Sequence, residues 1–118
     1  MAKILIVDDA AADRIQLERL VAQAGHTAVS AASAEEALAK ARNELPALVF
    51  MDVNMPGTDG FTAARQLASD PKTKNIPIVF VTAKNQKADR VFAQILGARS
   101  FISKPYTPEQ INEQLSSL

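Results

Sequence analysis

Three acidic residues and one lysine stand at the ends of apolar runs in the sequence. If these runs form buried strands, the four side chains lie at the edge of a sheet. Asp8 and Asp9 end the first such run, and Asp52 ends a second. Lys104 ends a shorter run near the C-terminus. A carboxylate in such a position is costly to ionise unless a cation pairs with it. If the strands are neighbours in one parallel sheet, the four side chains meet, and Asp52 could accept a phosphoryl group.

Three carboxylates in one crevice repel each other, and one lysine cannot balance them. A hard divalent cation can. Mg²⁺, or Mn²⁺ in its place, needs only one or two carboxylates, a carbonyl and several waters. The chain has no cysteine, and its single histidine is not near these runs, so nothing indicates zinc. The cation, Lys104 and the hydroxyl of Thr82 would stabilise the negative charge on a transferring phosphoryl group.

Five apolar runs of strand length alternate with five helical patterns. We expect strands at residues 3–7, 27–31, 48–51, 76–81 and 101–102, and helices at 11–24, 34–45, 61–70, 88–96 and 108–118. Strict alternation predicts a parallel sheet with helices on both faces. We therefore predict an α/β fold of flavodoxin-like type: a doubly wound five-stranded parallel sheet in the order 2-1-3-4-5, with five helices.

This strand order explains why the acids should meet. An open doubly wound sheet binds its ligand at the carboxyl ends of its strands, where the strand order reverses. In the order 2-1-3-4-5 the reversal lies between the first and third strands. Asp8 and Asp9 should therefore face Asp52 across the crevice, with Thr82 and Lys104 on the same edge.

Two local patterns give finer predictions. Ser33 and Glu36 have the spacing of a capping box, with Ser33 as the N-cap and Glu36 reaching back to it. The helix at 88–96 carries its apolar residues at helical spacing, namely Ala88, Val91, Phe92, Ile95 and Leu96.

Composition limits the class of protein. The 118 residues suffice for one domain, and the 47% of apolar residues can form a core. Thirteen basic and thirteen acidic side chains balance, so net charge gives no reason to expect nucleic acid or a membrane as partner. No signal peptide or membrane-length apolar stretch is evident. We expect a cytoplasmic monomer over residues 1–118, without an output domain.

The sequence resembles the receiver domains of two-component response regulators, particularly the single-domain chemotaxis type. The match runs from Ile4 to the last helix. It rests on four motifs, which are weak singly and specific together: Asp8-Asp9, residues 51–57 with Asp59-Gly60, Val81-Thr82-Ala83, and Lys104-Pro105. The stretch from Gly57 through Lys84-Asn85-Gln86, together with residues 97–99, is more similar to the pilus-retraction regulators of twitching motility than to flagellar ones.

The resemblance implies roles for the matched acids. Asp52 would be the phosphoacceptor. Asp9, Asp52 and the backbone carbonyl of Asn54 would bind Mg²⁺ directly, and Asp8 would help through water.

The resemblance also implies a switch. Thr82 and Lys104 would contact the phosphoryl oxygens, and the Lys104–Pro105 peptide bond would be cis. Phosphorylation would draw Thr82 inward and let Phe101 rotate in behind it. A partner protein would then bind the face made by the fourth helix, the fifth strand and the fifth helix. The donor would be a sensor histidine kinase, and the chain would catalyse only its own modification, so it would not be an enzyme in the usual sense.

Two positions depart from the family pattern. Phe101 stands where many chemotaxis receivers carry tyrosine, and it offers a partner no hydroxyl. Lys84, two residues after Thr82, stands where flagellar regulators commonly carry an acid. Lys84 and Asn54 would flank the path of the water that removes the phosphoryl group, so the resemblance does not fix the phosphoryl lifetime.

Other functions fit the sequence less well. A phosphohydrolase with an aspartyl-phosphate intermediate needs an acid two residues after its nucleophile, where this chain has Asn54. A flavin carrier needs a Ser/Thr/Gly phosphate loop after the first strand, where Asp8 and Asp9 would repel a phosphate. The remaining alternatives are a phosphate sink and a degenerate receiver that only binds partners. The intact acids, Thr82 and Lys104 argue against the degenerate form.

Overall fold

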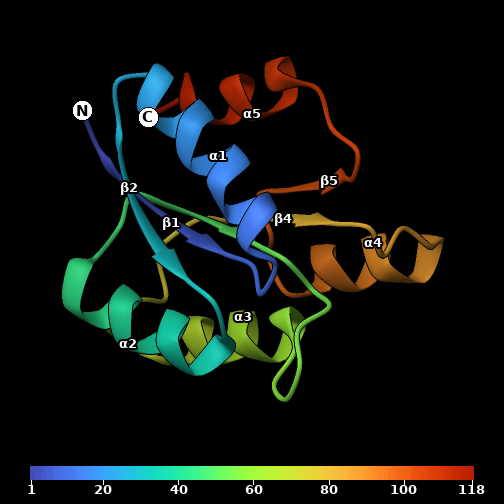
Figure 1. Ribbon diagram of the computed structural model, residues 1–118. Helices are drawn as coiled ribbons and strands as arrows, with labels where there is room; N and C mark the ends of the chain where they lie inside the picture. The colour runs from blue at the N-terminus through green and yellow to red at the C-terminus, as the bar shows by residue number, and fades with distance from the viewer.

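The computed structural model describes all residues 1–118 and has five strands alternating with five helices (Figure 1). In chain order these are β1 (Lys3–Val7), α1 (Ala11–Gln23), β2 (Thr27–Ala31), α2 (Ala34–Glu44), β3 (Leu48–Met51), α3 (Gly60–Ser69), β4 (Ile78–Thr82), α4 (Lys87–Ile95), β5 (Ser100–Ser103) and α5 (Pro108–Leu115). The strands form one parallel sheet in the order β2-β1-β3-β4-β5, which confirms the predicted fold. None of the helices has the length and apolar character needed to span a membrane.

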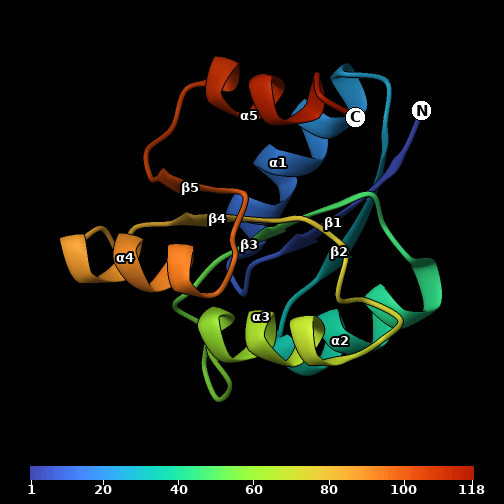
Figure 2. The same ribbon diagram turned by 180° about the vertical axis from the view of Figure 1, so that it is seen from behind.

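Helices cover both faces of the sheet (Figures 1 and 2). Helices α1 and α5 lie on one face, where Leu17 and Ile111 belong to the same buried cluster as Ile4 and Ile6 of β1. Helices α2, α3 and α4 lie on the other face, over a larger cluster that includes Leu5. Successive side chains of β1 therefore enter opposite layers, as the two-residue period of a strand requires.

The register of β1 and β3 sets the position of the acids. Val7 pairs with Met51, so Asp8 and Asp52, one residue further along each strand, leave the sheet side by side. The Asp52 N–H donates to the Val7 carbonyl at 2.9 Å, which holds the acid against the end of β1. Behind it, Gly60 begins α3 so close to β3 that an added Cβ would lie 2.0 Å from the Asp52 carbonyl oxygen. Only glycine fits this approach.

Several finer predictions need correction. Ser33 does cap α2, since its hydroxyl accepts the Glu36 N–H at 3.2 Å. Glu36, however, reaches one residue further back than predicted and accepts the Ala32 N–H at 2.7 Å. Strand β4 begins at Ile78, two residues later than predicted, because Pro77 cannot donate to a ladder. Strand β5 is one residue longer at each end than the predicted 101–102.

Helix α4 buries only part of its apolar set. Its inward face carries Asp89, Phe92 and Ala93, which are buried or half-buried. Val91 and Ile95 instead point to solvent, with 45% and 73% of their surface exposed. The helix thus offers two apolar side chains that its own fold does not cover.

Replacing Phe80 by alanine should lower the free energy of unfolding by about 3–5 kcal/mol, because truncating a buried aromatic side chain leaves a cavity. Phe80 is fully buried in β4, and its ring meets Phe61 edge to face at a centroid distance of 5.1 Å. Val91→Ala on the exposed face of α4 is the matched control and should change stability by less than about 0.5 kcal/mol. Urea unfolding measures both. Equal losses would contradict this assignment of core and surface.

Candidate functional site

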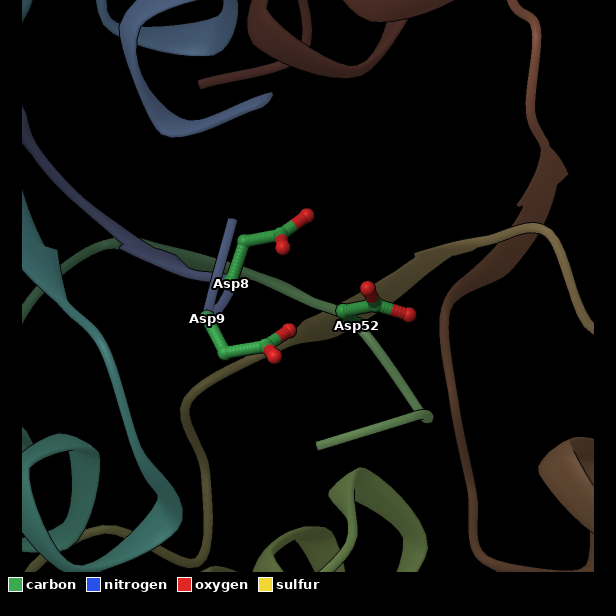
Figure 3. Close-up of side chains that lie close together, drawn as sticks. All are labelled: Asp8, Asp9 and Asp52. Atoms are coloured by element: carbon green, nitrogen blue, oxygen red, sulfur yellow. The ribbon is translucent and has the colours of Figure 1, made fainter. Parts of the chain in front are cut away.

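Asp8, Asp9 and Asp52 project from the ends of β1 and β3 into one space (Figure 3). One carboxylate oxygen from each lies within 4.8 Å of the others. Asp8 and Asp52 are buried, and Asp9 is exposed at the mouth of the site. Converging oxygens without nitrogen or sulfur donors suit a hard cation of the Mg²⁺ type. The residues present therefore fit the predicted metal.

Lys104 crosses from the end of β5 and places its ammonium among the acids. Its Nζ lies 2.7 Å from Asp8 Oδ2 and 3.2 Å from Asp52 Oδ2. It also lies 3.1 Å from Asp13 Oδ2, in the first turn of α1. The structure thus brings the predicted base and acids together and adds one carboxylate to them.

Asp13 belongs to the site although no sequence pattern singled it out. Asp13 lies off the apolar stripe of its helix, which is typical of a solvated side chain. The one available signal was its place in the first turn after Asp8 and Asp9, since that turn starts at the same edge of the sheet as the acids. Arg14 was likewise not predicted; it donates from Nη1 to the Asp8 carbonyl at 2.7 Å and holds the β1–α1 loop.

Burial sets the electrostatics of this cluster. It raises the pKa of Asp8 above its ordinary value of 3.8, although hydrogen bonds from Lys104 and the Ala10 N–H act in the opposite direction. Burial would lower the pKa of Lys104, but the carboxylates of Asp8, Asp13 and Asp52 outweigh it and raise that pKa above 10.5. Lys104 is therefore charged at neutral pH, and the crevice keeps an excess of negative charge.

The other predicted residues surround this cluster. Asn54 donates its backbone N–H to Asp52 Oδ1 at 3.3 Å, which places its peptide beside the acid. Thr82 is fully buried at the end of β4, and its hydroxyl accepts the Lys84 N–H at 3.2 Å. The Lys104–Pro105 peptide bond, for which the resemblance implied the cis form, is cis.

Phe101 and Lys84 both connect to α4. Phe101 is half-buried, 6.4 Å from the Phe80 ring between centroids, and the Arg90 guanidinium covers it at 4.9 Å. The Lys84 ammonium lies 3.8 Å from the carboxylate of Asp89, in the first turn of α4. Lys84 therefore points toward this helix and not toward the acids.

Comparisons with known proteins agree with this geometry. The model of the response regulator receiver domain family matches residues 4–116. Protein PilH of Pseudomonas aeruginosa is 38% identical over 118 residues, which cover the whole chain and 98% of that protein. The response regulator PleD of Caulobacter vibrioides is also 38% identical, over 99% of this chain but only 26% of its own length. The chemotaxis protein CheY4 of Vibrio cholerae superposes with a TM-score of 0.92 at 31% identity, covering 99% of this chain and 98% of its own.

Replacing Asp8 by asparagine should raise the free energy of unfolding at pH 7 in the absence of divalent cations. Burial holds the pKa of folded Asp8 above 3.8, so the folded chain binds more protons than the unfolded chain just above that pH. Stability therefore falls as the pH rises through this range, and a neutral amide avoids that loss.

Urea unfolding at pH 7 and below pH 3.8 measures the effect, which should shrink in acid because Asp8 is then protonated in both states. Asp9→Asn, at the exposed neighbour, is the control and should have a smaller effect. A loss of stability on Asp8→Asn at pH 7 would contradict the electrostatic interpretation.

Proposed function

The chain belongs to the family of response regulator receiver domains, and on this premise we propose that it accepts a phosphoryl group from a sensor histidine kinase on Asp52, with Mg²⁺ as cofactor. The observation that carries the proposal is the convergence of Asp8, Asp9 and Asp52, with Lys104 paired to Asp8 and Asp52. A cluster with excess negative charge at the strand-order reversal attracts a cation, and the positive charge of that cation would offset the repulsion between the carboxylates and an incoming phosphoryl group.

Asp52 is the nucleophile. A carboxylate oxygen attacks phosphorus while the bond to the kinase imidazole nitrogen breaks, and the electron pair of that bond leaves with the imidazole. Asp9, Asp52 and the Asn54 carbonyl would hold Mg²⁺, with Asp8 acting through water. When bound, the cation supplies positive charge against the carboxylates and the transferring oxygens.

The neighbouring side chains stabilise the transferring group. Lys104, whose Nζ lies 3.2 Å from Asp52 Oδ2, donates to the oxygens of the transferring group. The Thr82 hydroxyl gives up its hydrogen bond from the Lys84 N–H and bonds the phosphoryl group instead, so the hydroxyl turns inward. Phe101 then rotates behind Thr82, out from under Arg90. The phosphoryl group biases an existing equilibrium between two arrangements of this surface.

The α4–β5–α5 face carries the signal to a partner. Residues 84–103, which include α4 and β5, contain four lysines and arginines but one acid, Asp89, which is buried. Helix α5 carries Glu109 and Glu113 instead, so the excess of positive charge is confined to the α4 and β5 part of the face. Val91 and Ile95 are exposed on α4 within this basic segment. A partner segment with acidic and apolar residues would complement both features. The balanced charge of the whole chain conceals this local excess.

The protein acts in this proposal as a stand-alone switch that turns over no free substrate. The match to PilH over 98% of that protein supports the stand-alone form. The likeness to the chemotaxis protein CheY4 supports a role in chemotaxis. The resemblance of this sequence to the pilus-retraction regulators supports twitching motility as the alternative. The intact acid–lysine cluster favours a phosphoacceptor over a receiver that only binds partners.

Incubating the protein with acetyl phosphate and Mg²⁺ should add one phosphoryl group, because Asp52 is the buried nucleophile of the site. Intact-mass spectrometry detects the group, and mild base should remove it, as expected of an acyl phosphate. Asp52→Asn and a sample treated with a metal chelator should remain unmodified. Glu35→Gln, at an exposed acid on α2, is the control and should be modified like the wild type. Modification of Asp52→Asn, or none of the wild type, would overturn the proposal.

A further inference from the structure

Asp13 stands apart from the carboxylates that could hold a cation. The oxygens that converge belong to Asp8, Asp9 and Asp52. Asp13 comes instead from the first turn of α1 and meets the ammonium of Lys104. Its contact with the site is therefore to the lysine alone, and the role argued above for the other acids does not extend to it.

The lysine has no donor to spare. An ammonium group carries three N–H donors. Lys104 accordingly has three carboxylate acceptors, at 2.7 Å for Asp8, 3.1 Å for Asp13 and 3.2 Å for Asp52. The contact with Asp52, the proposed acceptor of the phosphoryl group, is the longest of the three. A donor directed at Asp13 is one that a phosphoryl group on Asp52 does not receive.

We infer that Asp13 is a positioning residue that competes with the phosphoryl group for Lys104. This inference rests on the proposed function. In the unphosphorylated protein Asp13 takes one of the three donors and holds the ammonium toward α1. When Asp52 carries the phosphoryl group, that donor turns to a phosphoryl oxygen and Asp13 is released.

Exposure explains why Asp13 is the acceptor that yields. The side chains of Asp8 and Asp52 are 2% and 8% exposed, so neither can lose its lysine partner without leaving a buried charge. The Asp13 side chain is 42% exposed, so water can solvate it after release. A partly exposed ion pair is weak, so breaking the Asp13–Lys104 pair costs little free energy. That cost nevertheless disfavours the phosphorylated state.

Asp13→Asn should therefore strengthen binding of the phosphoryl mimic beryllium fluoride in the presence of saturating Mg²⁺. A neutral amide holds the ammonium less firmly and keeps the shape of the side chain. The dissociation constant should fall by about two- to fivefold, which is the range of a partly exposed ion pair. Asp13→Glu retains the charge and should bind the mimic like the wild type. Isothermal titration calorimetry measures all three proteins.

Two further measurements separate positioning of the lysine from a general effect. Glu18→Gln removes the other acid of α1, whose partner is the Ser30 hydroxyl, and should leave beryllium fluoride binding unchanged. The NMR chemical shifts at the Lys104 side-chain terminus should move in unliganded Asp13→Asn and not in Glu18→Gln, because Asp13 contacts this ammonium whereas Glu18 is bonded to Ser30.

The outcomes distinguish the inference from the proposed function. Tighter binding in Asp13→Asn, with the Lys104 shift change, supports the inference. Unchanged or weaker binding in Asp13→Asn, while the wild type binds the mimic, overturns the inference and leaves the proposed function standing. Equal gains in Asp13→Asn and Glu18→Gln overturn it too, because they would reflect net charge. Absence of binding by the wild type overturns both.

Discussion

The site depends on one ammonium group shared among more carboxylates than it can neutralise. Lys104 contacts Asp8, Asp13 and Asp52, while Asp9 stands at the mouth of the same crevice. Partial burial strengthens each of these interactions, attractive and repulsive. The raised pKa of Asp8 shows that burial prevails over the lysine at that position. The folded chain therefore holds an electrostatic strain that a bound divalent cation would relieve.

Backbone geometry forces this arrangement. The parallel register brings the ends of β1 and β3 together, and the N–H of Asp52 is fixed to the Val7 carbonyl. Gly60 lets α3 begin directly against the Asp52 peptide, which removes the space in which that segment could shift. The acids thus sit on rigid elements, whereas Lys104 reaches them on a long flexible side chain. A change in the site would then move the lysine and its neighbours before it moves the acids.

Most of the fold, and most of this site, could be predicted from the sequence. Strands β1 and β3 end where their apolar runs end, and the parallel order follows from strict alternation with helices. The rotation of α4 could not be predicted, because the six apolar residues between 88 and 96 left several faces possible. Tertiary packing decides between these faces and turns Ala93 inward. The ion pair between Asp13 and Lys104 was equally out of reach, since it joins residues 91 positions apart through side-chain conformations that leave no periodic pattern.

Titration of the ¹⁵N-labelled protein with Mg²⁺, followed by NMR, tests most directly whether the acidic cluster is a cation site. We predict saturable binding of one ion, with the largest amide shifts in the loops after β1 and β3, around Asp8, Asp9, Asp52 and Asn54. Asp9→Asn should weaken the binding without unfolding the protein, because Asp9 is the exposed member of the cluster. Shifts that do not saturate, or that centre elsewhere on the protein, would contradict the assignment of this crevice as the centre of the protein's chemistry.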